Sequence, residues 1–344
     1  MHFNSKQKTI CFALILFSTF CIPSHALQYR HNDILLKLTG YGTAGLIEPD
    51  FNTPEFIGDW RVRGEINYDI TKANSFGLVY AIDANAVEND TYMREGFAFY
   101  SIRHIGRIEI GFTDSIARKL GIGLPDVGGL RINDKPIFHK KIHPDGPVIA
   151  DTILSTGRDA LRINLASTQI NGTQYGLSVA GITDDYNYAI DTGIKIRRPS
   201  GKIKTAYSFG ASFMSKPDNF SNEIYTPNVT ADWRAQFTTG FNLQYNSWLW
   251  GTSARIIYDK NPIGPISDGL VVGTGVSYDL FKYSMSLTYM FSDTGIWNHD
   301  VKDFMDHMIV GSFRYKYSKY IDGWMSLGIT SDTPFISAGM RLTF

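Results

Sequence analysis

Hydrophobic and polar residues alternate along most of this chain. In the segment WRVRGEINYDI, residues 60–70, apolar residues occupy the even positions and charged or polar residues the odd positions, with Gly64 as the one gap. A period of two predicts a β-strand whose two faces meet different surroundings. The apolar face of such a strand packs either against a protein core or against lipid, and this segment alone does not decide between them.

Similar segments recur throughout the chain after residue 26, and the sequence predicts sixteen strands. Convincing helical periodicity is confined to one short turn near residue 117. The predicted strands are residues 34–44, 60–70, 75–84, 93–103, 107–113, 159–167, 173–182, 186–197, 202–214, 232–245, 248–259, 270–279, 283–292, 306–317, 321–330 and 335–344. Strand 93–103 fits either register, because Arg94 and Glu95 are adjacent charges that an ideal strand would place on opposite faces.

Short and long connections tend to alternate between these segments. The short ones include TKAN (71–74), QING (169–172), PSG (199–201) and NS (246–247), whereas residues 45–59, 215–231 and 293–305 form long ones. This order is typical of an up-and-down meander whose two rims face different compartments.

The strand faces indicate a membrane barrel. In residues 283–292, Tyr, Met, Leu, Tyr and Phe alternate with Ser, Ser, Thr, Met and Ser, and aromatic residues gather at strand ends, as interfacial girdles require. The alternative is a soluble barrel or sandwich with an apolar interior. Sixteen strands closed on themselves leave a bore too wide for side chains to fill, so the interior must hold water. The predicted fold is therefore all-β, a 16-stranded antiparallel transmembrane β-barrel.

The N-terminal segment has the pattern of a secretory signal peptide. Lys6 and Lys8 precede the apolar run ICFALILFSTFCI (10–22), and Ser24-His25-Ala26 resembles a cleavage site. We expect residues 1–26 to be removed and residues 27–344 to form the barrel. Removal takes away Cys11, Cys21 and both lysines but no acid, so Lys+Arg falls from 33 to 31 against 33 Asp+Glu. This near-balance argues against nucleic acid as a partner.

At this level the chain resembles the general porins of Gram-negative outer membranes. Strand number and loop order match over the whole chain after residue 26, and the final segment SAGMRLTF (337–344) resembles the terminal strand of that family. The resemblance implies residence in the outer membrane, contact with its lipid, a homotrimer, and recognition of Phe344 by the outer-membrane insertion machinery. It also implies passive diffusion of small hydrophilic solutes and ions, without a cofactor.

The third long connection, residues 114–158, is far longer than an ordinary loop, and such loops are usually functional or disordered. Within it, TDSIARKLG predicts a short helix with Asp114 or Ser115 as N-cap and Gly121 as C-cap. PDVGG (125–129) resembles the PEFGG of the loop that narrows the pore of enteric porins. The resemblance implies that the loop folds inward and that Asp126 faces the pore; Leu130 departs from the family pattern.

A loop of this kind would carry acids, so the wall opposite it should carry bases. Arg61 and Arg63 share one strand face, and an arginine facing lipid at the midplane costs about 2–4 kcal/mol, so both should face water. The sequence thus predicts a pore constriction in which basic residues face acidic ones: Arg61, Arg63, Arg103 and Arg162 against Asp126, Asp134 and Asp145. Such opposed charges would bias ion passage; alternatively, they simply solvate the wall.

Other functions remain open at this point. His139 and His143 in HKKIH have a spacing that suits a metal on a helix, but the lysines between them and the following proline favour a solvated loop. A substrate-selective channel is the main alternative, although most aromatic residues fall on the lipid face rather than in the bore. A barrel enzyme of the lipase or protease type is a further one; neither a G-x-S-x-G nor an HExxH motif occurs. A plug-type transporter is disfavoured, since only seven residues separate the signal from the first strand.

Overall fold

The computed structural model forms one closed antiparallel barrel. It describes residues 27–51, 53–85, 90–128, 160–182, 187–216, 232–260, 266–293, 305–330 and 333–344. The strands are β1 (Leu27–His31), β2 (Ile34–Pro49), β3 (Glu55–Asp69), β4 (Asn74–Asn85), β5 (Asp90–Ile102), β6 (Gly106–Phe112), β7 (Leu161–Ser167), β8 (Thr173–Ile182), β9 (Asn187–Ser200), β10 (Ile203–Ser215), β11 (Trp233–Tyr245), β12 (Trp248–Lys260), β13 (Ile266–Leu280), β14 (Tyr283–Asp293), β15 (Met305–Lys316), β16 (Ile321–Thr330) and β17 (Thr333–Thr343). One short helix, α2 (Ile116–Leu120), follows β6.

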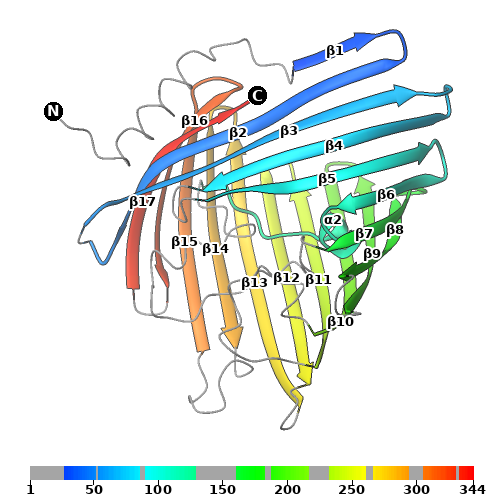
Figure 1. Ribbon diagram of the computed structural model, residues 1–344. Coiled ribbons are helices and arrows are strands. Elements are labelled where there is room, and N and C mark those ends of the chain that lie inside the picture. Colours follow the sequence, from blue (N-terminus) through cyan, green and yellow to red (C-terminus); the bar gives the residue numbers. More distant parts are fainter. Residues whose placement is uncertain are drawn as a thin grey trace, which may run out of the picture.

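Each strand from β2 to β17 pairs with its neighbour in sequence, and β17 pairs with β2 to close the ring (Figure 1). These sixteen strands confirm the predicted architecture. At the seam, the ladder runs on to the end of the chain: the Phe344 N–H donates to the Gly40 carbonyl at 3.0 Å, and the Gly40 N–H donates to the Phe344 carbonyl at 2.8 Å. The last residue is therefore part of the closure.

Strand β1 is the element that the pattern did not predict. It pairs with the first part of β2, from Leu27 opposite Leu38 to His31 opposite Ile34, and lies outside the ring of sixteen. Five residues are too few to show a reliable alternation.

The exposed fractions confirm that the apolar faces point outward. On β14, Met285 and Leu287 are 51% and 55% exposed, whereas Ser284 and Thr288, which point inward, are buried. Large exposed apolar side chains occur all around the barrel, far more than a monomer in water leaves open. Among the residues described, no helix has the length and apolar character needed to cross a membrane.

The inner side of the barrel consists of two unlike walls. Strands β3–β6 carry charged side chains into the bore, beside Tyr41 of β2. Helix α2 lies inside the ring of strands (Figure 1). From α2 to Gly128 the chain lies against glycine and serine residues of β8–β16. We call β2–β6 the charged wall and the inward-facing residues of β8–β16 the loop wall.

Candidate functional site: the charged wall, the inner loop and the turn-side pocket

The charged wall begins with an ion pair across strands β3 and β4. Arg61 lies opposite Asp83 in the ladder, and its Nε and Nη2 donate to the two carboxylate oxygens at 2.6 and 2.8 Å. On the other side Arg61 faces Tyr41, with its guanidinium carbon 5.6 Å from the ring centroid, and the Tyr41 hydroxyl donates to Asp59. Arg61 is thereby fixed on three neighbouring strands.

Arg63, two residues further along, pairs with two carboxylates. Its Nη1 lies 3.0 Å from Glu65 and its Nε lies 3.3 Å from Glu95 on β5. Arg61 and Arg63 thus both face the bore, as expected from their shared face. Their charges are balanced by acids on the same wall, whereas the predicted acidic partners were on the opposite side of the pore.

A β-bulge resolves the ambiguous register of β5. Ala81 pairs with Glu95 whereas Ile82 pairs with Met93, so Arg94 is the extra residue. The bulge allows two adjacent charges to share the inner side of the barrel, which a regular strand forbids. Arg94 is almost fully buried, and its two terminal nitrogens lie 3.6 Å from Asp83 and 3.4 Å from Asp114. Arg94 therefore connects the charged wall to the first residue of the long loop.

Helix α2 starts the loop inside the barrel. Ser115 is its N-cap and accepts a hydrogen bond from the Arg118 N–H, and the Gly121 N–H donates back to the Arg118 carbonyl. The predicted short helix is thus confirmed. Gly176 and Gly193 allow it to lie flat on the wall, because a Cβ at these positions would come within 2.4 Å of Ile116 Cγ1 and 3.1 Å of Ala117 Cα.

After α2 the loop continues across the loop wall, held by hydroxyl side chains. The Ile122 N–H donates to Ser208 on β10, the Thr288 hydroxyl of β14 donates to the Pro125 carbonyl, and the Val127 N–H donates to Ser286. Glycines leave room for it, since a Cβ at Gly240 would come within 2.7 Å of the Ile122 carbonyl oxygen. The loop therefore folds inward, as expected, at least as far as Gly128.

Asp126 lies on this inward segment, on a different side of the ring from β3. It accepts a hydrogen bond from the Gly128 N–H at 2.8 Å, which bends the chain in an Asx turn. Its neighbours Pro125 and Val127 contact β14, whereas Arg61 and Arg63 are on β3. The other predicted acids, Asp134 and Asp145, lie outside the described residues, as do His139 and His143.

Two of the predicted constriction arginines, Arg162 and Arg103, lie away from Arg61 and Arg63. Arg162 is wrong as a pore-lining residue: its side chain is fully buried, and its Nη1 donates to Asp191 at 2.6 Å and to Ser178 at 3.3 Å. Arg103 is exposed, but it follows the end of β5 at the short-turn rim, where its N–H donates to the Ala73 carbonyl. That rim is about eight residues along β3 from Arg61, roughly 26 Å.

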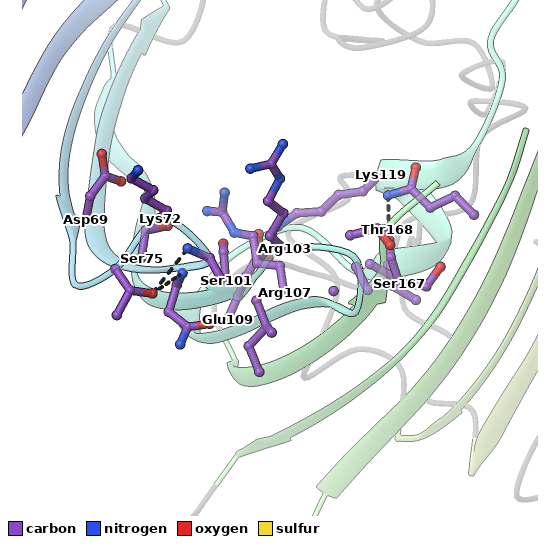
Figure 2. Close-up of a pocket in the computed structure, with 18 of the residues that line it drawn as sticks. Asp69, Lys72, Ser75, Ser101, Arg103, Arg107, Glu109, Lys119, Ser167 and Thr168 are labelled. Carbon is purple, nitrogen blue, oxygen red and sulfur yellow. Dashed lines mark hydrogen bonds and ion pairs between the residues drawn. The ribbon is translucent and has the colours of Figure 1, made fainter. Parts of the chain in front are cut away.

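A second charged cluster lies between α2 and the short-turn end of the charged wall. Glu109 on β6 pairs with Arg107 at 3.1 Å and with the Lys119 ammonium of α2, and Asn164 donates to Glu109 at 2.9 Å. Arg107 is also stacked on Phe99, with its guanidinium carbon 3.7 Å from the ring centroid. Arg107, Glu109 and Lys119 line one side of a cavity of about 500 Å³, shown in Figure 2. We call it the turn-side pocket.

Comparisons with known proteins bear on the fold. No protein-family model matches the sequence, and no curated protein sequence is similar to it. Solved structures do match. OmpT, an outer membrane protein of Vibrio cholerae, aligns with a TM-score of 0.66 at 10% identity, covering 93% of this chain and 100% of OmpT. The chain has the porin fold.

Two further structures share this fold at similarly low sequence identity. The anion-selective porin from Comamonas acidovorans aligns with a TM-score of 0.62 at 11% identity, covering 90% of this chain and 100% of the porin. OmpF of Salmonella typhi, solved with daunomycin, aligns with a TM-score of 0.64 at 11% identity, covering 92% and 100%. At such identities the porin fold is shared, whereas individual pore residues are not transferable.

Proposed function

We propose that this protein is an outer-membrane porin, through which small hydrophilic solutes and ions diffuse passively. The observation that carries the proposal is the closed ring of sixteen strands with apolar residues outside and charged or hydroxyl-bearing residues inside. Hydrocarbon provides no hydrogen-bond partners, so a closed barrel is the only kind of sheet that can span it. Transport of this kind involves no chemical step, and we assign no enzymatic activity to the chain.

The charged wall would set the ion preference of the channel. Arg61 and Arg63 hold positive charge in the bore, and Asp83, Glu65 and Glu95 hold negative charge beside them. Paired charges on one wall orient dipolar solutes but give little net preference for anions or cations. We therefore propose a weakly selective pore, narrowed by α2 and the inward loop.

The surroundings of the barrel follow from the same proposal. We place the protein in the outer membrane of a Gram-negative bacterium, with lipid against its apolar face and with Phe344 read by the insertion machinery. OmpT has been solved in a trimer form, with a TM-score of 0.63 to this chain. We propose a homotrimer here as well.

Planar-bilayer recording of the purified protein tests this function. We expect stepwise, ohmic currents whose conductance rises nearly in proportion to salt concentration, and a ratio of cation to anion permeability close to one. A protein that inserts and gives no steps would overturn the channel. Release of fatty acid or peptide by the same preparation, in the absence of steps, would instead favour a barrel enzyme.

A further inference from the structure

The turn-side pocket has the size and chemistry of a ligand site. Its volume of about 500 Å³ lies within the range of pockets that bind small molecules, about 300–1,000 Å³. The turn ends of β3 to β8 form its sides and α2 forms another part, through Ile116, Lys119 and Leu120. The pocket therefore opens to the bore of the channel and not to lipid.

Positive charge exceeds negative charge in this pocket. Its lining includes the cations Lys72, Arg103, Arg107 and Lys119 and the acids Asp69 and Glu109. Asp69 already forms an ion pair with Arg30, which is outside the pocket, and Glu109 is shared by Arg107 and Lys119. Within the described part of the chain, the side chains of Lys72 and Arg103 have no acidic partner within ion-pair distance. The pocket thus offers net positive charge to a ligand.

The cations are partly preorganised. Arg107 lies on the face of Phe99, and the Lys119 ammonium lies 4.9 Å from the centroid of the Phe97 ring. Both side chains are also held by Glu109. Fixed donors lose less conformational entropy on binding than free surface lysines do. Figure 2 shows Arg103 and Arg107 in the middle of the pocket, between Lys72 and Ser75 on one side and Lys119 and Thr168 on the other.

Hydroxyl and amide groups complete the lining. They are those of Thr71, Asn74, Ser75, Ser101, Ser167, Thr168 and Gln174. Such groups both donate and accept hydrogen bonds, which suits a ligand that carries hydroxyl groups of its own.

We propose that the turn-side pocket binds small hydroxylated organic anions, that is, a carboxylate or phosphate group on a polyhydroxylated body. The anionic group would contact Arg103, Arg107 and Lys72, and the hydroxyls would contact the serine and threonine side chains. Guanidinium groups match carboxylate and phosphate oxygens in pairs. Because Arg107 already pairs with Glu109, Arg103 carries most of the recognition. The inference rests on the proposed function, since it makes the pocket a stopping point for solutes that pass through the channel.

Blocking of the ion current tests the proposal. Gluconate or glucose 6-phosphate, added at the short-turn side of single channels in planar bilayers, is expected to reduce the current in a saturable manner. Glucose at the same concentration should not, and inorganic phosphate should act at least about tenfold more weakly. Equal block by glucose would overturn the role of charge, and equal block by inorganic phosphate would overturn the role of the hydroxylated body.

Single-residue variants test whether the block of the current arises in the turn-side pocket. Arg103→Gln is expected to raise the half-blocking concentration at least about fivefold, and Lys72→Gln to raise it less. The matched control is Lys282→Gln, which removes an exposed lysine from another short turn, outside the pocket. Unchanged block in Arg103→Gln, or an equal loss in the control, would overturn the site.

A binding measurement separates this inference from the proposed function. Calorimetric titration of the detergent-solubilised protein with glucose 6-phosphate should show a heat of binding, whether or not the protein conducts. In Arg103→Gln the measured affinity should be lower. Ohmic steps without block or binding would overturn the pocket and leave the channel intact. Binding without steps would support the pocket and overturn the channel.

Discussion

The barrel contains two sets of arginine–carboxylate pairs that differ in their access to water. On the charged wall, the guanidinium side is accessible: Arg61 and Arg63 keep 20% and 29% of their side chains exposed, although Asp83, the partner of Arg61, is itself buried. Further round the ring, Arg162–Asp191 and Arg234–Asp259 are almost completely buried, with N–O distances of 2.6 and 2.7 Å. The same residue types therefore occupy two dielectric environments in one sheet.

This difference assigns different roles to the two sets. A buried pair is expensive to break, because removal of one partner leaves an uncompensated charge out of water. A pair with a partly exposed guanidinium is screened by water and contributes less to stability, but its charges act on passing ions. Stability should thus depend on the buried pairs, and selectivity on the charged wall.

The largest effect is expected from Arg162→Met. It leaves the fully buried Asp191 without the Arg162 guanidinium, at a cost of about 3–5 kcal/mol. Urea unfolding in detergent micelles, followed by tryptophan fluorescence, measures the loss. The double variant Arg162→Met/Asp191→Leu should recover most of it, since neither charge of this pair is then left buried. Recovery of nothing would show that burial of charge is not the cause.

Ion selectivity should respond to the double variant Arg61→Ser/Arg63→Ser. The change leaves the carboxylates of Asp83, Glu65 and Glu95 unbalanced, so the wall becomes negative. One charge at about 6 Å in water is worth about 0.7 kcal/mol, or about threefold, and the variant removes two, so the cation-to-anion permeability ratio should rise at least about threefold.

Reversal potentials across a salt gradient give this ratio. Arg61→Lys/Arg63→Lys is the control and should keep the wild-type value, because both charges remain. If the permeability ratio of the serine variant equals that of the wild type, the charged wall does not act on the permeating ions and the prediction is wrong.

A third test addresses the hydrogen bonds that attach the inward loop to the loop wall. Ser208→Ala and Ser286→Ala each remove one hydrogen bond to a loop N–H, worth about 1 kcal/mol. Since 1 kcal/mol is a factor of about five, amide exchange at Ile122 and Val127 should accelerate about fivefold in the respective variants. Ser277→Ala, an inward-facing buried serine of β13, is the control and should leave both amides unchanged.

Part of the charged wall could be predicted from the sequence. The short connection 71–74 brings Asp69 opposite Ser75, and counting back along the hairpin places Arg61 opposite Asp83. Asp83, the acidic partner of Arg61, could therefore be predicted from the sequence, because a tight turn fixes the register of a hairpin. Strand ends were predicted to within five residues, because lipid on one side and water on the other impose alternation on each strand.

Other features depend on contacts between distant segments. The only sign of the bulge at Arg94 in the sequence is a pair of adjacent charged residues. The pairing with β4 is needed to show which of the two is the extra residue. The path of the loop depends on glycines such as Gly193 and Gly240, which in the sequence look like ordinary strand glycines. Arg162 looks like any inward-facing arginine, and nothing in its own strand indicates that it is buried.

The smallest effect is expected from Arg30→Ala. Arg30 forms an ion pair with Asp69 at the short-turn rim, but 60% of its side chain is exposed. Exposed pairs of this kind contribute about 0–1 kcal/mol, so the unfolding free energy should change by less than about 0.5 kcal/mol. The same urea titration measures it beside Arg162→Met. A loss as large as that of Arg162→Met would show that access to water does not separate the two sets of pairs, and the division between stabilising and selecting charges would fail.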